Sequence, residues 1–228
     1  MSTINPANAS HSWPPVAVPT GLLSEAQFEA WRRQYADVRA EWIEGSVQMM
    51  SPVSFEHADL VLWLGGLLRI FCEHYRLGVV VGPEFMIRLG AGTSRRVPDL
   101  MFVSNERRHL ILENHLEGAP DLVMEVISPE SAQRDREEKF REYQAAEVRE
   151  YWLLDPHSTD KSTETPSSEI AVYSRGNEAV GAAWMPIELQ QSCWHSQLLP
   201  GFYLKSAWLV ADSRPPLLEV LRAWQIIS

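Results

Sequence analysis

The spacing of hydrophobic residues along the chain predicts three main helices. After Pro52, leucines and aromatic residues recur three or four positions apart from Leu60 to Tyr75, which is the period of a helix with one buried face. Ser24 with Gln27 three residues later forms a capping-box sequence, and such a sequence marks the start of a helix. Helices are therefore predicted at about 24–35, 54–76 (with Gly78 as terminator) and 131–146.

Short runs of β-branched and aromatic residues predict strands between these helices. Residues 41–50 indicate a hairpin that turns at Glu44 and Gly45. Further strands are expected at 79–81, 85–89, 97–103, 122–127, 150–154 and 170–173, with weaker ones near 184–189 and 202–205. The intervening segments 90–96 and 157–168 are predicted loops, the latter at the tip of a hairpin. This order is typical of an α/β (α+β) fold built around one mixed sheet.

Composition and length fit one globular domain. The chain has 228 residues, of which 45% are hydrophobic, so it can bury a sizeable core. The Pro-rich residues 1–20 show no hydrophobic period and are predicted to be a disordered tail. We expect a single domain over 21–212 and a helical C-terminal segment over 213–228.

The small number of cysteines and the short apolar runs indicate the cellular compartment. Two cysteines, Cys72 and Cys193, are expected to be buried reduced thiols rather than a bridge or a nucleophile. The longest apolar run, 60–68, is too short to cross a membrane, and no secretory signal precedes it. We therefore expect a cytoplasmic protein with no membrane partner.

The charge balance limits the classes of nucleic-acid protein to be considered. With 20 Lys and Arg against 30 Asp and Glu, the formal net charge is −10. Such a balance argues against a protein that coats nucleic acid non-specifically, because that affinity comes mainly from basic residues on phosphates. It leaves room for a local basic cleft, or for a site where metal ions carry the positive charge.

Two acidic residues in strongly apolar strands are candidates for chemistry. Asp99 follows Pro98 at the start of a β-prone run, and Glu125 lies inside the apolar strand 122–127. A buried carboxylate is costly without a partner or a metal. The alternatives are a turn aspartate at a strand start and an edge-strand glutamate that faces water.

The charged helix 131–146 carries a further candidate group. Asp135, Lys139 and Tyr143 recur four positions apart and therefore share one face. Charged helices usually make a solvated surface, so a surface pair is the alternative. Phe140 and Tyr143 must point inward, however, and that would bring Lys139 to the sheet edge. Two carboxylates and a lysine so placed are suited to holding Mg²⁺ and stabilising charge on a phosphate.

Several spaced motifs agree in order with one known family. The chain resembles the Uma (two-type) family of restriction-endonuclease-like proteins over about residues 24–210. The motifs are W-I-E-G-S-V, S-P-V-S-F-E-H-A-D-L, P-D-L-M-F-V, G-A-P-D-L-V-M-E-V-I-S-P, R-D-R-E-E-K-F-R-E-Y and V-R-E-Y-W-L-L-D-P. The resemblance implies the PD-(D/E)XK nuclease superfamily, with a mixed sheet flanked by helices.

The resemblance also implies roles for single residues. Asp99 would be the metal-binding aspartate and Glu125 the second carboxylate. The superfamily often places its lysine two positions after that glutamate, where this chain has Ile127, so the resemblance nominates Lys139 from the next helix instead. Asp135 and Tyr143 would support the face of that lysine.

Two more positions match the family pattern in the N-terminal half. Glu44 would add a third carboxylate, and His57 would contact a phosphate or water; the alternatives are a turn acid and a cap histidine. Ser46 stands where the family often has a glutamate after the turn glycine, so one further acid is missing from the pattern.

The resulting hypothesis is an endonuclease dependent on Mg²⁺, or alternatively Mn²⁺, that hydrolyses DNA phosphodiester bonds. Contacts to the DNA backbone are expected from basic residues near the site, namely Arg95, Arg96, Arg107, Arg108 and His109. A homodimer is expected, since cutting a duplex takes two sites.

A different class of function competes with this hypothesis. The acidic balance and nine tryptophans would also suit an inactive nuclease-fold protein that serves as a binding or assembly module. An RNA-processing nuclease would use the same site.

Overall fold

The computed structural model describes most of the chain, namely residues 17–35, 38–90, 92–157, 159–160, 165–166, 169–175, 183–210, 212 and 214–228. Residues 1–16 of the predicted tail lie outside the described residues. Its last part contacts the fold, because the backbone carbonyl of Ala17 accepts a hydrogen bond from Trp31 Nε1 at 3.0 Å.

The larger sheet has six strands in the order β13-β12-β9-β8-β6-β3. Its inner strands β8 and β9 run parallel, while their neighbours pair antiparallel, so the sheet is mixed as predicted. The strands are β3 (Gly78–Val81), β6 (Leu100–Ser104), β8 (Leu122–Val126), β9 (Glu150–Asp155), β12 (Glu169–Ser174) and β13 (Met185–Pro186).

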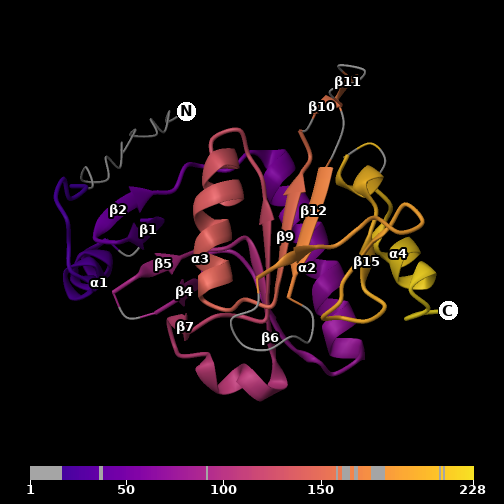
Figure 1. Cartoon of the computed structure of the whole chain (residues 1–228), viewed down its shortest axis with the longest axis horizontal. Coiled ribbons are helices and arrows are strands. Elements are labelled where there is room, and N and C mark those ends of the chain that lie inside the picture. Colours follow the sequence, from indigo (N-terminus) through magenta and orange to yellow (C-terminus); the bar gives the residue numbers. More distant parts are fainter. Residues whose placement is uncertain are drawn as a thin grey trace, which may run out of the picture.

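Helices cover both faces of this sheet. Helix α2 (Phe55–His74) packs on one face, and α3 (Phe140–Ala145) lies on the other (Figure 1). A single π-helical segment, η2 (Arg134–Lys139), leads directly into α3. The prediction of a mixed sheet flanked by helices is therefore confirmed.

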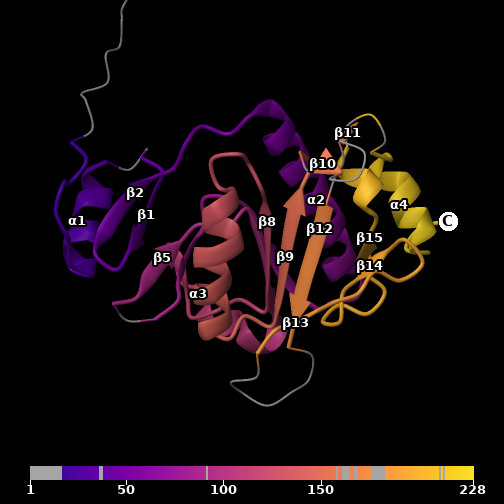
Figure 2. The same cartoon turned by 45° about the horizontal axis from the view of Figure 1, so that its top comes forward.

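A second sheet of five strands stands beside the first, in the order β2-β1-β5-β4-β7 (Figures 1 and 2). Helix α1 (Glu25–Gln34) packs on it through Phe28 and Trp31, and Ser24 and Gln27 form the predicted capping box. The strands are β1 (Ala40–Ile43), β2 (Ser46–Met49), β4 (Met86–Arg88), β5 (Ser94–Arg96) and β7 (His115–Glu117).

The expectation of one sheet was wrong, because the chain crosses from the smaller sheet to the larger one between β5 and β6. Pro98 has no N–H group to give to a sheet, and the chain changes partners around it. Before it, β5 pairs with β1 and β4 in the smaller sheet; after it, β6 pairs with β3 and β8 in the larger one. The predicted loop 90–96 thus contains a strand.

The end of helix α2 also differs from the prediction. The helix ends at His74, and Arg76 takes the left-handed conformation with φ 55°. Gly78 is instead the first residue of β3. An added Cβ there would lie 2.1 Å from the carbonyl oxygen of Val103, so close strand pairing is what requires this glycine.

The remaining elements complete the core at the C-terminal end. Helix α4 (Leu217–Ala223) lies near the C-terminal end, and its Val220 and Leu221 pack in the same core as α2. The other elements are η1 (Asn105–Leu110), η3 (Ser206–Leu209), and two short antiparallel pairs, β10 (Thr159–Asp160) with β11 (Thr165–Pro166) and β14 (Trp194–His195) with β15 (Tyr203–Leu204).

Two smaller expectations can be compared with the described residues. Cys72 and Cys193 are both buried free thiols, as predicted. In the described part of the chain, no helix is long and apolar enough to pass through a membrane.

Strand β8 directs its side chains alternately to the two helical layers. Leu122, Met124 and Val126 belong to the core under α2, whereas Val123 and Ile127 belong to the core under α3. Because side chains alternate along a strand, Glu125 shares the face of Val123 and Ile127. The carboxylate is therefore aimed at η2 and α3.

Candidate active site

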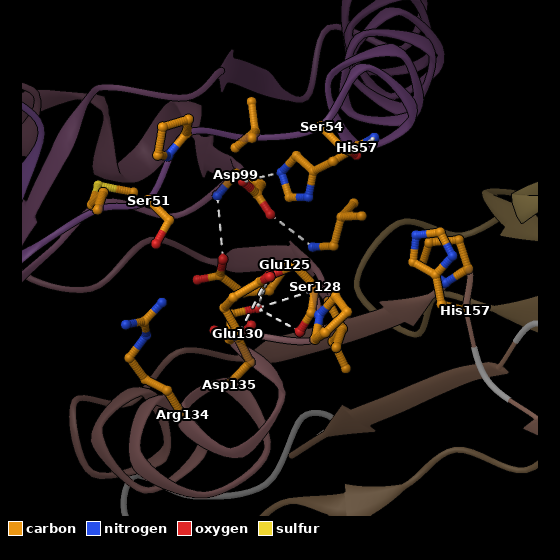
Figure 3. Close-up of a pocket in the computed structure, with 18 of the residues that line it drawn as sticks. Ser51, Ser54, His57, Asp99, Glu125, Ser128, Glu130, Arg134, Asp135 and His157 are labelled. Atoms are coloured by element: carbon orange, nitrogen blue, oxygen red, sulfur yellow. Dashed lines mark hydrogen bonds and ion pairs between the residues drawn. The ribbon is translucent and has the colours of Figure 1, made fainter.

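Asp99 and Glu125 come together at the edge between two paired strands. The register of β6 with β8 sets Leu100 opposite Met124, which places Asp99 beside Glu125. The backbone N–H of Asp99 donates to Glu125 Oε2 at 3.4 Å, and the N–H of Val126 donates to Asp99 Oδ2 at 2.8 Å (Figure 3). Glu125 is 2% exposed, so it is not an edge residue that faces water.

Lys139 is inserted between two carboxylates. Its Nζ lies 2.9 Å from Glu125 Oε1 and 2.9 Å from Asp135 Oδ1. Tyr143 from α3 donates its hydroxyl to Glu125 Oε1 at 2.9 Å. All four side chains are buried, so the shared face of the charged helix points inward and the surface-pair alternative is wrong.

The protonation properties of the site follow from this burial. Desolvation raises the pKa of Glu125 to about 8; Asp135 and Asp99 push it in the same direction, and Lys139 opposes them. Burial alone would lower the pKa of Lys139, but the surrounding carboxylates, Glu125 first among them, outweigh burial and raise it. The group therefore holds more negative than positive charge in a dry environment.

His57 contacts the aspartate directly. It lies in the first turn of α2, where Ser54 Oγ accepts its backbone N–H at 3.1 Å. Its Nε2 is 3.1 Å from Asp99 Oδ1 (Figure 3). Its Nδ1 is buried without a hydrogen-bond partner among the described residues. The structure thus brings His57 to Asp99.

Glu44 is not brought into this group. It occupies the hairpin turn with φ 47°, its backbone N–H donates to the carbonyl oxygen of Thr93, and it does not line the pocket around Asp99. Another hairpin acid, Glu41, is 2% exposed and lies closer to the site. Sequence reasoning overlooked it, although a lone acid between Ala40 and Trp42 is the same signal that marked Glu125.

Glu41 anchors the segment that leads to Asp99. Its Oε1 accepts the N–H of Val97 and its Oε2 accepts Arg96 Nη1, both at 2.9 Å. Burial alone would raise the pKa of Glu41, but Lys139, Arg96 and the N–H of Val97 together lower it. Glu41 therefore holds its charge in the interior and fixes the strand end from which Asp99 projects.

The expectation that Arg95 and Arg96 contact DNA was wrong. Arg96 has no exposed surface and pairs with Glu41 and Glu142, while Arg95 is 7% exposed and pairs with acids of α1. Both side chains are used to hold the small sheet and its neighbours together.

The remaining predicted cations lie at a distance from the site. Arg107, Arg108 and His109 are in η1, which follows β6 at the end opposite Asp99. A strand rises about 3.3 Å per residue, so this end is roughly 17 Å away. Arg107 forms an ion pair with Asp121 at 3.7 Å.

The pocket around the carboxylates contains two arginines that the sequence did not single out, Arg39 and Arg134. It has a volume of about 420 Å³ and is also lined by Lys139, His57 and His157, together with acids and serines. Arg134 Nε is buried without a hydrogen-bond partner among the described residues. The side chain is drawn on the rim of the pocket, opposite His57 (Figure 3).

The donor atoms present suit a hard divalent cation. Mg²⁺ prefers oxygen ligands and is often bound through one or two carboxylates while keeping several waters. Asp99 and Glu125 offer such a pair, since the backbone nitrogen of Asp99 lies 3.4 Å from Glu125 Oε2. Across the described residues, no cluster of three or more His, Cys, Asp or Glu side chains is arranged to hold a metal. Water and substrate oxygens would have to complete the coordination shell.

A family model described as "Putative restriction endonuclease", Uma2, matches residues 25–206. The chain belongs to the Uma2 family. The predicted resemblance is thereby confirmed, and the match includes Glu44, His57, Asp99, Glu125 and Lys139.

Two individual proteins are similar to this Uma2 chain. "Uncharacterized protein sll1609" of Synechocystis sp. is 25% identical over 141 residues, which cover 61% of this chain and 78% of that protein. A crystal structure from Anabaena variabilis, described as a putative nuclease belonging to DUF820, has a TM-score of 0.57 and 17% identity. It covers 78% of this chain and 92% of its own. Family and fold together are nuclease-like.

Proposed function

We propose that this Uma2 protein is a metal-dependent endonuclease that hydrolyses phosphodiester bonds of DNA at Asp99 and Glu125. One observation carries the proposal: two carboxylates from neighbouring strands converge in a pocket, with the buried Lys139 against one of them. The nuclease-like family supports it.

The roles of the residues follow from their contacts. Asp99 and Glu125 would hold the metal, which when bound stabilises charge on the phosphate and lowers the pKa of a water. His57 and the N–H of Val126 orient the Asp99 carboxylate from either side. Tyr143 and Lys139 do the same for Oε1 of Glu125 and leave Oε2 toward Asp99.

Arg134 would bind a phosphate of the substrate. A guanidinium with a buried N–H that lacks a partner is destabilising until an anion occupies it. Arginine contacts phosphate in a fork geometry, and the substrate is a polyanion. This local cation would reduce, near the pocket, the repulsion between DNA and a chain of net charge −10.

A cleavage assay tests the proposal. Supercoiled DNA, linear duplex, single-stranded DNA and RNA are incubated with Mg²⁺, Mn²⁺ or EDTA. Wild-type protein and the matched control Glu106→Gln, an acid in η1 remote from the pocket, should nick DNA only with metal. Asp99→Asn and Glu125→Gln should lose at least about a hundredfold in rate, while far-UV circular dichroism stays unchanged.

The assay also separates the competing readings. Wild-type protein that nicks no nucleic acid in either metal would favour the inactive binding module. Cleavage of RNA but not of DNA would change the proposed substrate from DNA to RNA and leave the assignment of the active-site residues unchanged.

A further inference from the structure

A second hollow adjoins the candidate active site. It has a volume of about 530 Å³ and runs between α2 and the turn from β3 to β4. It shares lining residues with the first pocket, namely Arg39, Val53, His57 and Asp99. The two hollows therefore lie next to each other at the aspartate. We call the second one the apolar groove.

The walls of this groove are mostly apolar and open. Val61, Val80 and Leu100 line it, and Leu62 at its rim is 76% exposed. An added Cβ at Gly82 would meet no atom within 4 Å, so this wall faces free space. One exposed leucine alone needs no explanation, but an apolar hollow that reaches Asp99 of the candidate active site does.

The groove is long enough for more than the scissile group. Arg69 lies at its far end, twelve residues along α2 from His57. At about 1.5 Å per residue this is roughly 18 Å. Its volume falls within the range of about 300–1,000 Å³ that holds a small organic ligand.

We propose that the apolar groove binds the sugar and the unpaired base of a nucleotide next to the scissile phosphate, an inference that rests on the proposed function. A strand whose phosphate sits between Asp99 and Arg134 must place an adjoining nucleoside within a few ångströms of them. Sugars and base faces are the apolar parts of DNA, and contact with Val61, Val80 and Leu100 would remove their apolar surface from water whatever the base. The preferred substrate is then single-stranded or locally opened DNA.

A second copy of the chain is the less suitable occupant. A helix or strand seated in the groove would lie over His57 and Asp99, because both residues line it. Such an interface would cover the candidate active site and exclude the substrate from it.

The test compares two oligomers that differ only in their bases. A twelve-residue oligothymidylate and an abasic deoxyribose-phosphate chain of equal length are titrated by fluorescence anisotropy with Ca²⁺ in place of Mg²⁺. Wild-type protein should bind the thymidylate about tenfold more tightly, which corresponds to removing roughly 55 Å² of apolar base surface from water. Gly82→Phe should remove that preference by filling the groove.

A matched variant controls for the added side chain. Gly21 also has no atom within 4 Å of an added Cβ, and neither glycine has a positive φ. Gly21→Phe should therefore keep the tenfold preference. In the same way, Leu62→Glu should weaken binding of the thymidylate, whereas Leu22→Glu, at 78% exposure, should not.

Several results would overturn the inference. They are equal affinity for the two oligomers, no binding of either one, a preference that survives Gly82→Phe, and conversion of a dimer to a monomer by Gly82→Phe in sedimentation. If the wild-type protein cleaves DNA but binds both oligomers equally, only the inference about the groove is contradicted. If it prefers the thymidylate but cleaves nothing, only the proposed activity is contradicted.

Discussion

Lys139 Nζ lies 2.9 Å from Glu125 Oε1, although one residue belongs to a π-helical turn and the other to an inner strand of the larger sheet. Burying such a pair is expensive, and an apolar pair of equal volume often serves stability as well or better. π-Helical turns are rare in proteins as a whole, and those that occur are often found at functional sites. A costly ion pair on a rare backbone turn is consistent with a site retained for its chemistry.

Removal of the lysine charge should expose that cost. Lys139→Met leaves Glu125 and Asp135 buried without their cation. We expect the free energy of unfolding to fall by about 3–5 kcal/mol in urea titrations, and metal-dependent cleavage to be lost. Lys205→Met is the control: this lysine lies over the ring of Trp208 near the surface, and its loss should change stability by less than about 1 kcal/mol. Equal stability of the two variants would contradict the role of the buried pair.

His57 should act by positioning Asp99. In His57→Ala, one oxygen of the Asp99 carboxylate loses its partner while the N–H of Val126 keeps the other. We expect about a 10–100-fold loss of activity and a higher Mg²⁺ concentration for half-maximal rate, as is typical when a group that orients a metal ligand is removed. His109→Ala in η1 should behave as wild type. A loss of rate with unchanged Mg²⁺ dependence would count against positioning.

Arg134 should contribute one phosphate contact. Arg134→Ala should weaken binding of all DNA sequences alike and reduce the slope of log K against log salt by about 1. Arg141→Ala is matched to it, because Arg141 follows in the same helical segment but is 73% exposed and pairs with Glu137. An unchanged salt slope in Arg134→Ala would show that this arginine does not meet a phosphate.

The buried Glu41 should make stability depend on pH. Its folded-state pKa lies below 4.5, so the ionised side chain adds stability that is complete above that pH and is lost as pH falls through the folded-state pKa. Glu41→Gln leaves Arg96 with Glu142 and the more distant Glu138, and should cost about 3 kcal/mol near pH 7. The difference from wild type should shrink as the pH falls through the lowered pKa of Glu41. Urea titrations of both proteins at neutral and at acidic pH measure this difference in the free energy of unfolding. A difference that does not change with pH would contradict the lowered pKa of Glu41.

Local sequence patterns determined much of this protein. The capping box at Ser24, the helical period of α2 and the hairpin turn at Glu44 depend on neighbours within a few residues, and their backbone geometry follows from them. A lone acid in an apolar strand marked Glu125, and the spacing of four marked Asp135, Lys139 and Tyr143. In each case the physical signal is a polar group where burial would be costly, or a shared helical face.

Only the tertiary structure decided which of these groups meet. The chain crosses at Pro98 from β5 in the smaller sheet to β6 in the larger one. Arg95 and Arg96 pair with acids of α1 and β1, Glu41 rather than Glu44 lies near the site, and Arg134 and the apolar groove lie beside Asp99. Such pairings join residues dozens of positions apart. They depend on strand register and on the face that each element buries, and a shift of one residue in register would turn every side chain of a strand to the other face.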